Sequence, residues 1–392
     1  MKWASAVSER PRLERAVQEC AASLKEQMGG ASVDFVMAFV SVYFMERCFD
    51  VNALVMDALP CNVFIGCSAA GIIGAGREVE NRPGLSLMAA SLPKVVVKPF
   101  ALRDEDLPDL DDPPRRWEAL VGVKAAENPH FVLLSDPFSV RLDNFLGGMD
   151  YAFPKAVKIG GVVSGALAPA QSALYLNSMC QRSGLVGVSF VGDLTMDPLV
   201  AQGCRPIGRP MTVTDCQENI LLELEKRPPL QVLQDLVDSL DPNDQELAKH
   251  SLFLGIIMDP RKETYGKGDF LIRNIIGADM KKGILAVGTR LRKGQGVQFH
   301  LRDARAAAQE LQTLLSSHGP SKDKIAGALL FSCLGRGEYL YGRRDHDSQM
   351  FQRTLGQKPL GGFFCNGEIG PVGASTYLHG YTSCFALLRP KW

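Results

Sequence analysis

Apolar residues recur every three or four positions in several parts of the chain, which is the spacing of one face of an amphipathic helix. The first such stretch runs from Leu13 to Leu24, and it follows Pro11, which suits the first turn of a helix. Gly29 and Gly30 predict where this helix ends. The same spacing predicts further helices at residues 52–59, 230–240 and 304–315.

Short apolar runs between glycine, proline or polar residues predict β-strands. Strands alternate with helices at first and then follow one another quickly, so we expect a mixed α/β (α+β) fold with β-sheets flanked by helices. No internal repeat is visible. The predicted strands are residues 33–42, 62–66, 94–100, 130–135, 157–163, 172–176, 185–191, 211–215, 251–258, 270–276, 284–290, 297–301, 326–333, 362–365 and 383–388.

A domain boundary is expected near residues 203–210, where two prolines and two glycines interrupt the pattern. We therefore predict two domains, residues 1–204 and 205–392. Residues 103–116 are rich in acidic residues and prolines, which is typical of a solvated surface excursion. Residues 293–296 have the glycines of a hairpin turn.

The charges of the chain balance, with 43 Lys and Arg against 43 Asp and Glu in 392 residues. This balance argues against binding to nucleic acid or to an acidic membrane surface, because both need a basic face. No apolar run approaches the roughly 18 residues of a membrane span. We expect a soluble cytoplasmic protein, or one of the plastid stroma if a transit peptide has been removed.

The ten cysteines include no Cys-x-x-Cys pair, so a disulfide framework and a structural zinc site are not expected. Cys333 and Cys365 each end an apolar strand immediately before a glycine loop. If those strands are neighbours, the two thiols could face one pocket as a redox pair, a soft ligand or a nucleophile. Buried inert cysteines are the alternative.

Three glycine-rich loops follow predicted strands, at residues 66–76, 335–337 and 361–373. None has the Walker pattern or the dinucleotide fingerprint, and tight turns between crowded strands are the alternative to a binding role. Arg336 and Glu368 lie inside two of these loops, where a charged residue either pairs internally or reaches a ligand.

The six histidines do not have the spacing of a metal site, and no serine-hydrolase elbow or glycosidase carboxylate pair is evident. His346 is expected in a solvated loop. His379, near Tyr377 and Tyr381, is the histidine that could face a pocket, although a structural role is the alternative.

Several motifs resemble the FIST family (F-box and intracellular signal transduction). They lie at residues 66–71 (Gly-Cys-Ser-Ala-Ala-Gly), 160–165 (Gly-Gly-Val-Val-Ser-Gly), 207–214, 268–274, 297–303, 331–337, 361–371 (Gly-Gly-Phe-Phe-Cys-Asn-Gly-Glu-Ile-Gly-Pro) and 379–382. The run at 361–371 is highly specific. The sequence is similar to stand-alone FIST proteins of cyanobacteria, algae and plants.

The resemblance implies a two-domain sensory module that binds small ligands such as amino acids, and in some bacterial relatives haem. It also implies a separate signalling partner, because no output domain is expected after residue 392 and no F-box before the first helix. A ubiquitin-ligase role is therefore disfavoured. For haem, no proximal ligand is assigned, and His379 and His300 are the two histidines considered.

We therefore expect a non-catalytic sensory protein that binds a small molecule, such as an amino acid, in a pocket of the C-terminal domain. Arg336 would bind its carboxylate and Glu368 its ammonium group. The alternatives are a thiol-dependent or redox enzyme using Cys333 and Cys365, and an adaptor in a larger complex. The full predicted site comprises Cys333, Gly335, Arg336, Gly337, Cys365, Asn366, Gly367, Glu368 and His379.

Overall fold

The computed structural model describes residues 1–391, and Trp392 lies outside the described residues. The chain forms two compact units. The larger unit comprises Met1–Val200, Gln312–Leu378 and Thr382–Trp392, and the smaller unit comprises Ala201–Leu311 and His379–Tyr381. These units are defined by contacts in space and not by sequence families, so the expected division between residues 204 and 205 stays a prediction.

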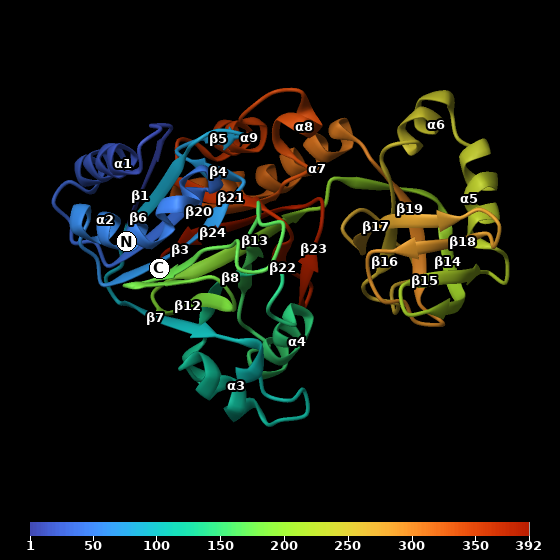
Figure 1. Ribbon diagram of the computed structural model, residues 1–392, viewed down its shortest axis with the longest axis horizontal. Coiled ribbons are helices and arrows are strands. Elements are labelled where there is room, and N and C mark those ends of the chain that lie inside the picture. Colours follow the sequence, from blue (N-terminus) through green and yellow to red (C-terminus); the bar gives the residue numbers. More distant parts are fainter. Residues whose placement is uncertain (392) are drawn as a thin grey trace. The chain divides into compact units, whose positions relative to one another are not determined.

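The larger unit contains three six-stranded β-sheets (Figure 1). The first has the order β1 (Lys2–Ser8), β6 (Leu85–Ser91), β2 (Phe35–Ser41), β3 (Val63–Ala69), β10 (Leu174–Leu176) and β11 (Met179–Gln181). The second has β7 (Val95–Leu102), β12 (Leu185–Gly192), β8 (His130–Ser135), β9 (Lys158–Val162), β22 (Glu368–Val372) and β23 (Ser375–His379). The third has β13 (Thr195–Ala201), β24 (Ser383–Arg389), β20 (Gly327–Cys333), β21 (Leu360–Cys365), β4 (Gly71–Gly74) and β5 (Arg77–Glu80).

The three sheets share one strand order. The centre of each is a parallel pair, β2 with β3, β8 with β9, and β20 with β21, and the strands next to each pair are antiparallel to it. A parallel pair needs a crossover connection, which is usually helical. These crossovers contain α2 (Val51–Ala58), α4 (Leu142–Ala152), and α8 (Gly337–Tyr341) with α9 (His346–Leu355). The larger unit is therefore a threefold repeat of one pattern.

Each repeat gives a hairpin to another repeat. The hairpin β4–β5 follows β3 in the chain but pairs with β21. The hairpin β10–β11 follows β9 but pairs with β3, and β22, which follows β21, pairs with β9. Each sheet is therefore completed by strands from a different part of the sequence.

A glycine motif marks the second strand of each parallel pair. The spacing Gly-x-x-x-x-Gly occurs at residues 66–71, 160–165 and 362–367. A Cβ atom on Gly66, Gly160 or Gly362 would overlap a carbonyl oxygen of the neighbouring parallel strand, so only glycine fits there. The expectation that the chain has no internal repeat was wrong, because the backbone shows a threefold repeat. These glycines are its main signature in the sequence.

The predicted first helix is confirmed as α1 (Leu13–Met28), which Gly29 ends in a left-handed conformation. Its buried face packs against β1 and β6. The helix α3 (Pro114–Val121), by contrast, overlaps the expected surface excursion at residues 103–116. Trp117 explains the difference, because it is fully buried and anchors α3 on the second sheet's core.

Aromatic side chains from different repeats meet in the core of the larger unit. The ring of Phe39 stacks on the ring of Phe363, with centroids 5.3 Å apart, and meets Phe331 edge-on at 6.5 Å. Phe39 comes from the first repeat and the other two from the third. Each large buried ring contributes about 1.5–3 kcal/mol by leaving water, so one shared core holds the repeats together.

The smaller unit is a closed six-stranded barrel with two helices (Figure 1). Its strands, in barrel order, are β14 (Cys204–Gln217), β15 (Ile220–Leu224), β18 (Ile284–Val287), β17 (Phe270–Asp279), β16 (Leu252–Ile257) and β19 (Gly296–Arg302). The helices are α5 (Pro229–Asp238) and α6 (Pro242–Ala248), and α7 (Ala304–Ser317) leads back to the larger unit.

Two sequence expectations about the barrel need correction. The glycines and prolines at residues 203–210 do not interrupt the β-structure, because β14 runs through them with a register shift between Ile207 and Met211. Residues 293–296 form a turn but not a hairpin, since β18 and β19 are not paired with each other.

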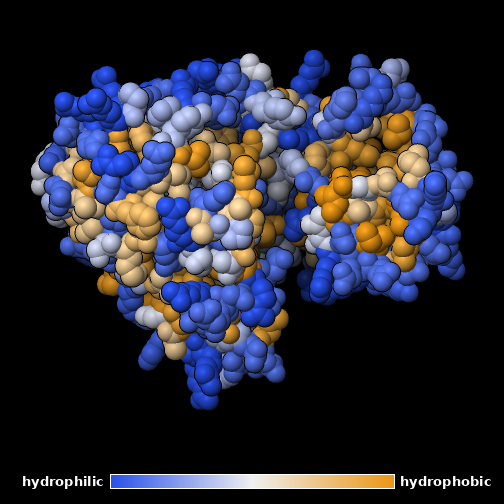
Figure 2. All heavy atoms as spheres, viewed as in Figure 1, coloured by the Kyte–Doolittle hydropathy of each residue, from blue (hydrophilic) through white to orange (hydrophobic). Residues whose placement is uncertain are grey.

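The surface mixes hydrophilic and hydrophobic side chains on the face shown in Figure 2. Within residues 1–391, no helix is both long enough and apolar enough to cross a membrane.

Candidate functional site

The carboxyl ends of β20 and β21 bring several of the predicted site residues together. The two strands are parallel neighbours, and their register places Cys333 beside Cys365. The loop after β20 carries Arg336. Glu368 is the first residue of β22 and follows Asn366 by two residues in the chain. Ligands often bind at this edge of an open sheet, so these strand ends are a candidate site.

Arg336 is completely buried and forms a two-point salt bridge with Asp347. Its Nε lies 2.9 Å from Asp347 Oδ2, and its Nη2 lies 3.3 Å from Asp347 Oδ1. Nη2 also donates to the hydroxyl of Tyr341 at 2.5 Å. The positive charge of Arg336 is therefore neutralised within the protein by a carboxylate that the sequence did not suggest.

Asp347 is held by further donors besides Arg336. Its Oδ1 lies 2.8 Å from Nδ1 of His346, and its Oδ2 accepts from the hydroxyl of Ser383 at 2.5 Å. Burial alone would raise the pKa of Asp347, but Arg336 and these hydrogen bonds hold that pKa well below its usual range. Asp347 is therefore a stable buried anion.

The expectation that His346 lies in a solvated loop was wrong. His346 is 4% exposed and begins α9, and its ring stacks on that of Tyr341 with centroids 3.4 Å apart. The signal that could have found this helix is the four-residue spacing of Asp347, Phe351 and Leu355, all of which are buried. The charged residues that precede Asp347 in the sequence concealed the buried face of this helix.

Glu78 reaches the same cluster from β5, far away in the sequence. Its Oε1 accepts from the backbone N–H of Ser348 at 2.8 Å and from the Ser348 hydroxyl at 2.9 Å. Burial and the negative charge of Asp347 raise the pKa of Glu78 to about 8. Its second oxygen has no hydrogen-bond partner among residues 1–391. The hairpin exchange between repeats explains how residue 78 comes to lie beside residue 348.

Glu368 is completely buried, and its Oε2 accepts from the backbone N–H of Thr382 at 3.2 Å. Burial raises the pKa of Glu368 well above its ordinary value, and the Thr382 N–H, the Arg336 charge and a hydrogen bond with Cys333 offset this only in part. Glu368 therefore binds a proton more readily than an ordinary glutamate does.

The strand-end cluster, which we define as Glu78, Arg336, His346, Asp347, Glu368 and Ser383, contains one firmly held ion pair and two buried carboxyl groups whose pKa is raised. A ligand carboxylate that bound Arg336 would have to compete with Asp347.

Thiols lie at one side of this cluster. Cys365 is completely buried, and desolvation is the main reason that its pKa is raised well above the usual value for cysteine, with the nearby charge of Glu368 adding to it. A thiol in this state is a weak nucleophile. Cys333 is partly exposed.

The other predicted site residues lie in three places. Gly335 and Gly337 flank Arg336, and Gly337 has a φ of +63°, a conformation that L side chains rarely adopt. Asn366 is exposed and Gly367 is buried in the turn before β22. His379 is 3% exposed and groups with the smaller unit. The ligand-binding role of all nine residues stays a prediction.

A hollow of about 490 Å³ lies at the carboxyl ends of the second parallel pair, β8 and β9. Volumes of this size are typical of small-molecule sites. Its lining includes Asp136 just after β8, Val162 at the end of β9, and the first turn of α4. Asn366 also lines it, so the hairpin from the third repeat brings a predicted site residue to this hollow.

Asp136 is the notable group of this hollow, and sequence reasoning missed it. Its side chain is 2% exposed. Oδ2 accepts from the backbone N–H of Phe138 at 3.0 Å and from the hydroxyl of Ser139 at 2.6 Å, whereas Oδ1 has no partner among residues 1–391. A buried carboxylate without a cationic partner is uncommon, because desolvating a charge is costly.

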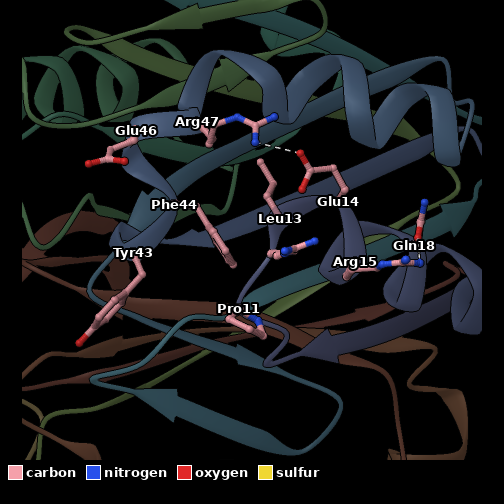
Figure 3. A pocket seen from close by; sticks show the side chains of 10 residues that line it. Pro11, Leu13, Glu14, Arg15, Gln18, Tyr43, Phe44, Glu46 and Arg47 are labelled. Carbon is pink, nitrogen blue, oxygen red and sulfur yellow. Dashed lines mark hydrogen bonds and ion pairs between the residues drawn. The ribbon is translucent and has the colours of Figure 1, made fainter.

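A second hollow, of about 660 Å³, lies between the start of α1 and the 3-10 helix η1 (Val42–Asp50) (Figure 3). Several of its lining side chains already bind one another, since Arg47 pairs with Glu14 at 2.9 Å and Arg15 donates to the amide oxygen of Gln18 at 3.2 Å. This hollow is therefore a weaker candidate than the one beside Asp136.

His300, considered above as a haem ligand, is part of the barrel wall. It is 1% exposed, its Nδ1 donates to the carbonyl oxygen of Gln298 at 3.0 Å, and its ring meets that of Phe270 with centroids 4.6 Å apart. Burial lowers the pKa of His300 to about 4. These contacts describe a packed structural histidine, so the residues present do not fit an axial haem ligand at this position.

Comparison with known proteins identifies both halves of the chain. The FIST N domain matches residues 34–227 and the FIST C domain matches residues 229–371. An uncharacterized protein of Mycobacterium tuberculosis strain H37Rv is 34% identical over 391 residues, which is 99% of each chain. An uncharacterized protein of Mycobacterium bovis is 33% identical over 382 residues, 96% of each chain.

Two more distant similarities complete the comparison. An F-box/LRR-repeat protein of Arabidopsis thaliana is 25% identical over 322 residues, which is 70% of this chain and 60% of that protein. The crystal structure of a cyanuric acid hydrolase from A. caulinodans aligns over 99% of both chains, but with 9% identity and a TM-score of 0.33 it carries no argument. The two matching domains and the full-length mycobacterial relatives show that the chain belongs to the FIST family.

Proposed function

We propose that this FIST protein is a small-ligand-binding sensor without catalytic activity of its own, and that its ligand enters the hollow at the ends of β8 and β9. The observation that supports this position is the buried carboxylate of Asp136, which lines the hollow without a cationic partner among residues 1–391. A ligand with an ammonium group would supply the missing positive charge.

The lining of the hollow favours a zwitterion such as an amino acid. Asp136 offers a negative charge, and Arg141 offers a positive one just before the first turn of α4. Arg141 is bound to Asp104 through its Nε at 2.9 Å, and its side chain is 63% exposed, so the outer part of its guanidinium group remains accessible. The amide of Asn366 can donate and accept hydrogen bonds.

A direct covalent path joins this hollow to the strand-end cluster. Asn366 lines the hollow, and Glu368 lies only two residues further on. The segment between them is clamped to β9, because the N–H of Asn366 donates to the Val162 carbonyl at 3.0 Å and the N–H of Val162 donates to the Gly367 carbonyl at 2.8 Å. A shift of Asn366 on ligand binding would therefore alter the environment of the Glu368 carboxyl group, and this is the signal that a partner protein would read.

The test is a thermal-shift screen of the full chain with the twenty amino acids, followed by Asp136→Asn. We expect a binding amino acid to raise the melting temperature of the wild type. Asp136→Asn should weaken that ligand by on the order of 1–3 kcal/mol, because it removes a charged hydrogen bond. Asp143→Asn is the matched control, since Asp143 lines the same hollow but is exposed.

The Glu368→Gln variant distinguishes a ligand bound beside Asp136 from a ligand bound at the site predicted from the sequence. If the ligand sits beside Asp136, Glu368→Gln retains binding, whereas a ligand ammonium group paired directly with Glu368 would lose on the order of 1–3 kcal/mol. Unchanged binding in Asp136→Asn would contradict the proposed position. The absence of any stabilising amino acid would contradict the proposed ligand class.

A thiol-dependent activity is the second candidate, because Cys333 and Cys365 are side by side. We expect Cys365 in the native protein to resist alkylation at pH 7, because burial keeps its thiol protonated. Iodoacetamide labelling with peptide mapping, before and after unfolding in urea, measures this. Rapid native labelling of either residue would support the enzymatic alternative over the sensor.

A further inference from the structure

A buried arginine of the smaller unit has no acidic partner. Arg302 is the last residue of β19 and is 7% exposed. Its Nε and Nη2 atoms are buried without a hydrogen-bond partner among residues 1–391, and no salt bridge joins it to a carboxylate in this part of the chain. Burying an unpaired charge is costly, because the protein interior replaces little of the hydration that the charge loses. The guanidinium group of Arg302 therefore lacks the anion that would offset its burial.

The residues next to Arg302 do not supply this anion. Asp303 follows it in the chain, but both carboxylate oxygens of Asp303 have other partners. Its Oδ2 lies 3.4 Å from Nε of Arg205, and its Oδ1 accepts from the backbone N–H of Arg305 at 2.8 Å. Across the sheet, the residue of β14 that is paired with Arg302 is Cys204. Neither the sequence neighbour nor the strand partner therefore offers a carboxylate to Arg302.

The two atoms without a partner form the edge of a guanidinium group that binds a carboxylate. Nε–H and Nη2–H point the same way and can donate two parallel hydrogen bonds to one carboxylate. The chain uses this edge elsewhere. Arg336 binds Asp347 through Nε at 2.9 Å and Nη2 at 3.3 Å. Arg389 binds Asp197 through Nε at 2.6 Å and Nη2 at 3.2 Å. In Arg302 the same edge has no protein carboxylate among residues 1–391.

Aromatic rings of the same unit hold the guanidinium group in place. Cζ of Arg302 lies over the ring of Tyr381, 5.0 Å from its centroid, and the centroids of Tyr381 and Phe253 are 4.3 Å apart. The hydroxyl of Tyr381 donates to Oδ1 of Asn274, which is exposed. Tyr381 has a φ of +62°, which bulky residues rarely adopt, and backbone strain of this kind is concentrated at sites that hold ligands. The vacant edge of Arg302 is therefore preorganised.

We propose that Arg302 is the centre of a ligand site in the smaller unit, which binds the carboxylate of a small molecule through Nε and Nη2. One arginine neutralises the single charge of a carboxylate but only half the charge of a phosphate dianion, so the site favours the carboxylate. The partly exposed ring of Tyr381 is the group that an entering ligand displaces or packs against. This site is independent of the hollow beside Asp136, which belongs to the larger unit.

The experiment is isothermal titration calorimetry of the full chain with sodium acetate, sodium benzoate and sodium phosphate, at neutral pH and constant ionic strength. Acetate and benzoate have no ammonium group, so they cannot be the ligand proposed for the hollow beside Asp136. We expect saturable binding of both carboxylates at one site. Phosphate should bind about tenfold more weakly or not at all, because the single charge of Arg302 does not match it.

Variants make the assignment specific. Arg302→Met should weaken carboxylate binding about tenfold or more, because it removes two charged hydrogen bonds. It should not lower the urea midpoint of the unliganded protein, since no ion pair is broken, whereas a purely structural arginine would lose stability. Arg302→Lys keeps the charge but not the planar fork, so it should also weaken binding. Arg290→Met is the matched control, because Arg290 belongs to the same unit and its side chain is 85% exposed.

The proposal is overturned if neither carboxylate binds the wild type, or if Arg290→Met weakens binding as much as Arg302→Met does. Tighter binding of phosphate than of both carboxylates, lost in Arg302→Met, would contradict the ligand class while retaining the site. Circular dichroism shows whether each variant is folded. If Arg302→Met does not fold, Arg302→Lys decides the matter, because a folded Arg302→Lys that binds both carboxylates as tightly as the wild type contradicts the forked contact.

Discussion

Replacing Asp347 with Asn is expected to destabilise the larger unit by about 3–5 kcal/mol, because it leaves the charge of Arg336 buried without its counter-ion. Arg336 is 0% exposed, so water cannot replace the lost carboxylate. The measurement is urea unfolding followed by tryptophan fluorescence. Trp3 and Trp117 are both buried in the larger unit, so fluorescence reports on that unit.

An exposed ion pair on the same loop is the control. Arg344 and Glu338 are joined at 3.0 Å with side chains about half exposed, so Arg344→Met should cost less than about 1 kcal/mol. Replacing both Arg336 and Asp347 with apolar residues should recover much of the loss, since no unpaired charge remains. A cost for Asp347→Asn no greater than that for Arg344→Met would contradict the importance of the buried pair.

Raising the pH from 5 to 8 is expected to destabilise the larger unit by about 4 kcal/mol through Glu78 alone. The folded-state pKa of Glu78 is about 8, above its ordinary value of 4.5. Between these values the folded state keeps a proton that the unfolded state releases. The stabilisation is therefore complete below pH 4.5, falls as the pH rises, and is lost above pH 8.

Glu78→Gln should flatten this pH dependence, because the amide stays neutral at every pH. Glu368→Gln should act in the same direction, since the pKa of Glu368 is also raised. Glu105→Gln is the control, because Glu105 is exposed. Urea midpoints at pH 5, 6, 7 and 8 give the slope for each variant. A slope in Glu78→Gln equal to that of the wild type would show that Glu78 does not carry the proton.

Much of the secondary structure followed from local pattern. Helix α1 could be placed from its apolar spacing and its terminal glycines, and strands such as β8 and β20 from short apolar runs. These features depend on residues close together in the chain. The positions of Cys333 and Cys365 at the ends of apolar strands followed in the same way, but that the two strands are neighbours did not follow from the sequence, and the structure pairs them.

The partners of the predicted charges could not be found in this way. Arg336 and Glu368 were identified, but Asp347 was hidden in a run of charged residues that resembles a solvated loop. Glu78 lies in another repeat and reaches Ser348 only through the exchanged hairpin. Asp136 gives no local signal, because its importance depends on the hollow and on the missing counter-ion. The surroundings of Asp347, Glu78 and Asp136 all depend on contacts between residues far apart in the chain. The local spacing of residues does not encode such contacts.

The hairpin exchange also bears on how the protein is made. The hairpin β4–β5 leaves the ribosome early, yet its neighbour β21 is synthesised almost 300 residues later, as positions 74 and 361 of their pairing indicate. Contacts of such high sequence separation make folding slow, because a long loop must close before they form. The exposed edge of this hairpin must therefore be protected from pairing with other chains during synthesis, which is work that chaperones perform.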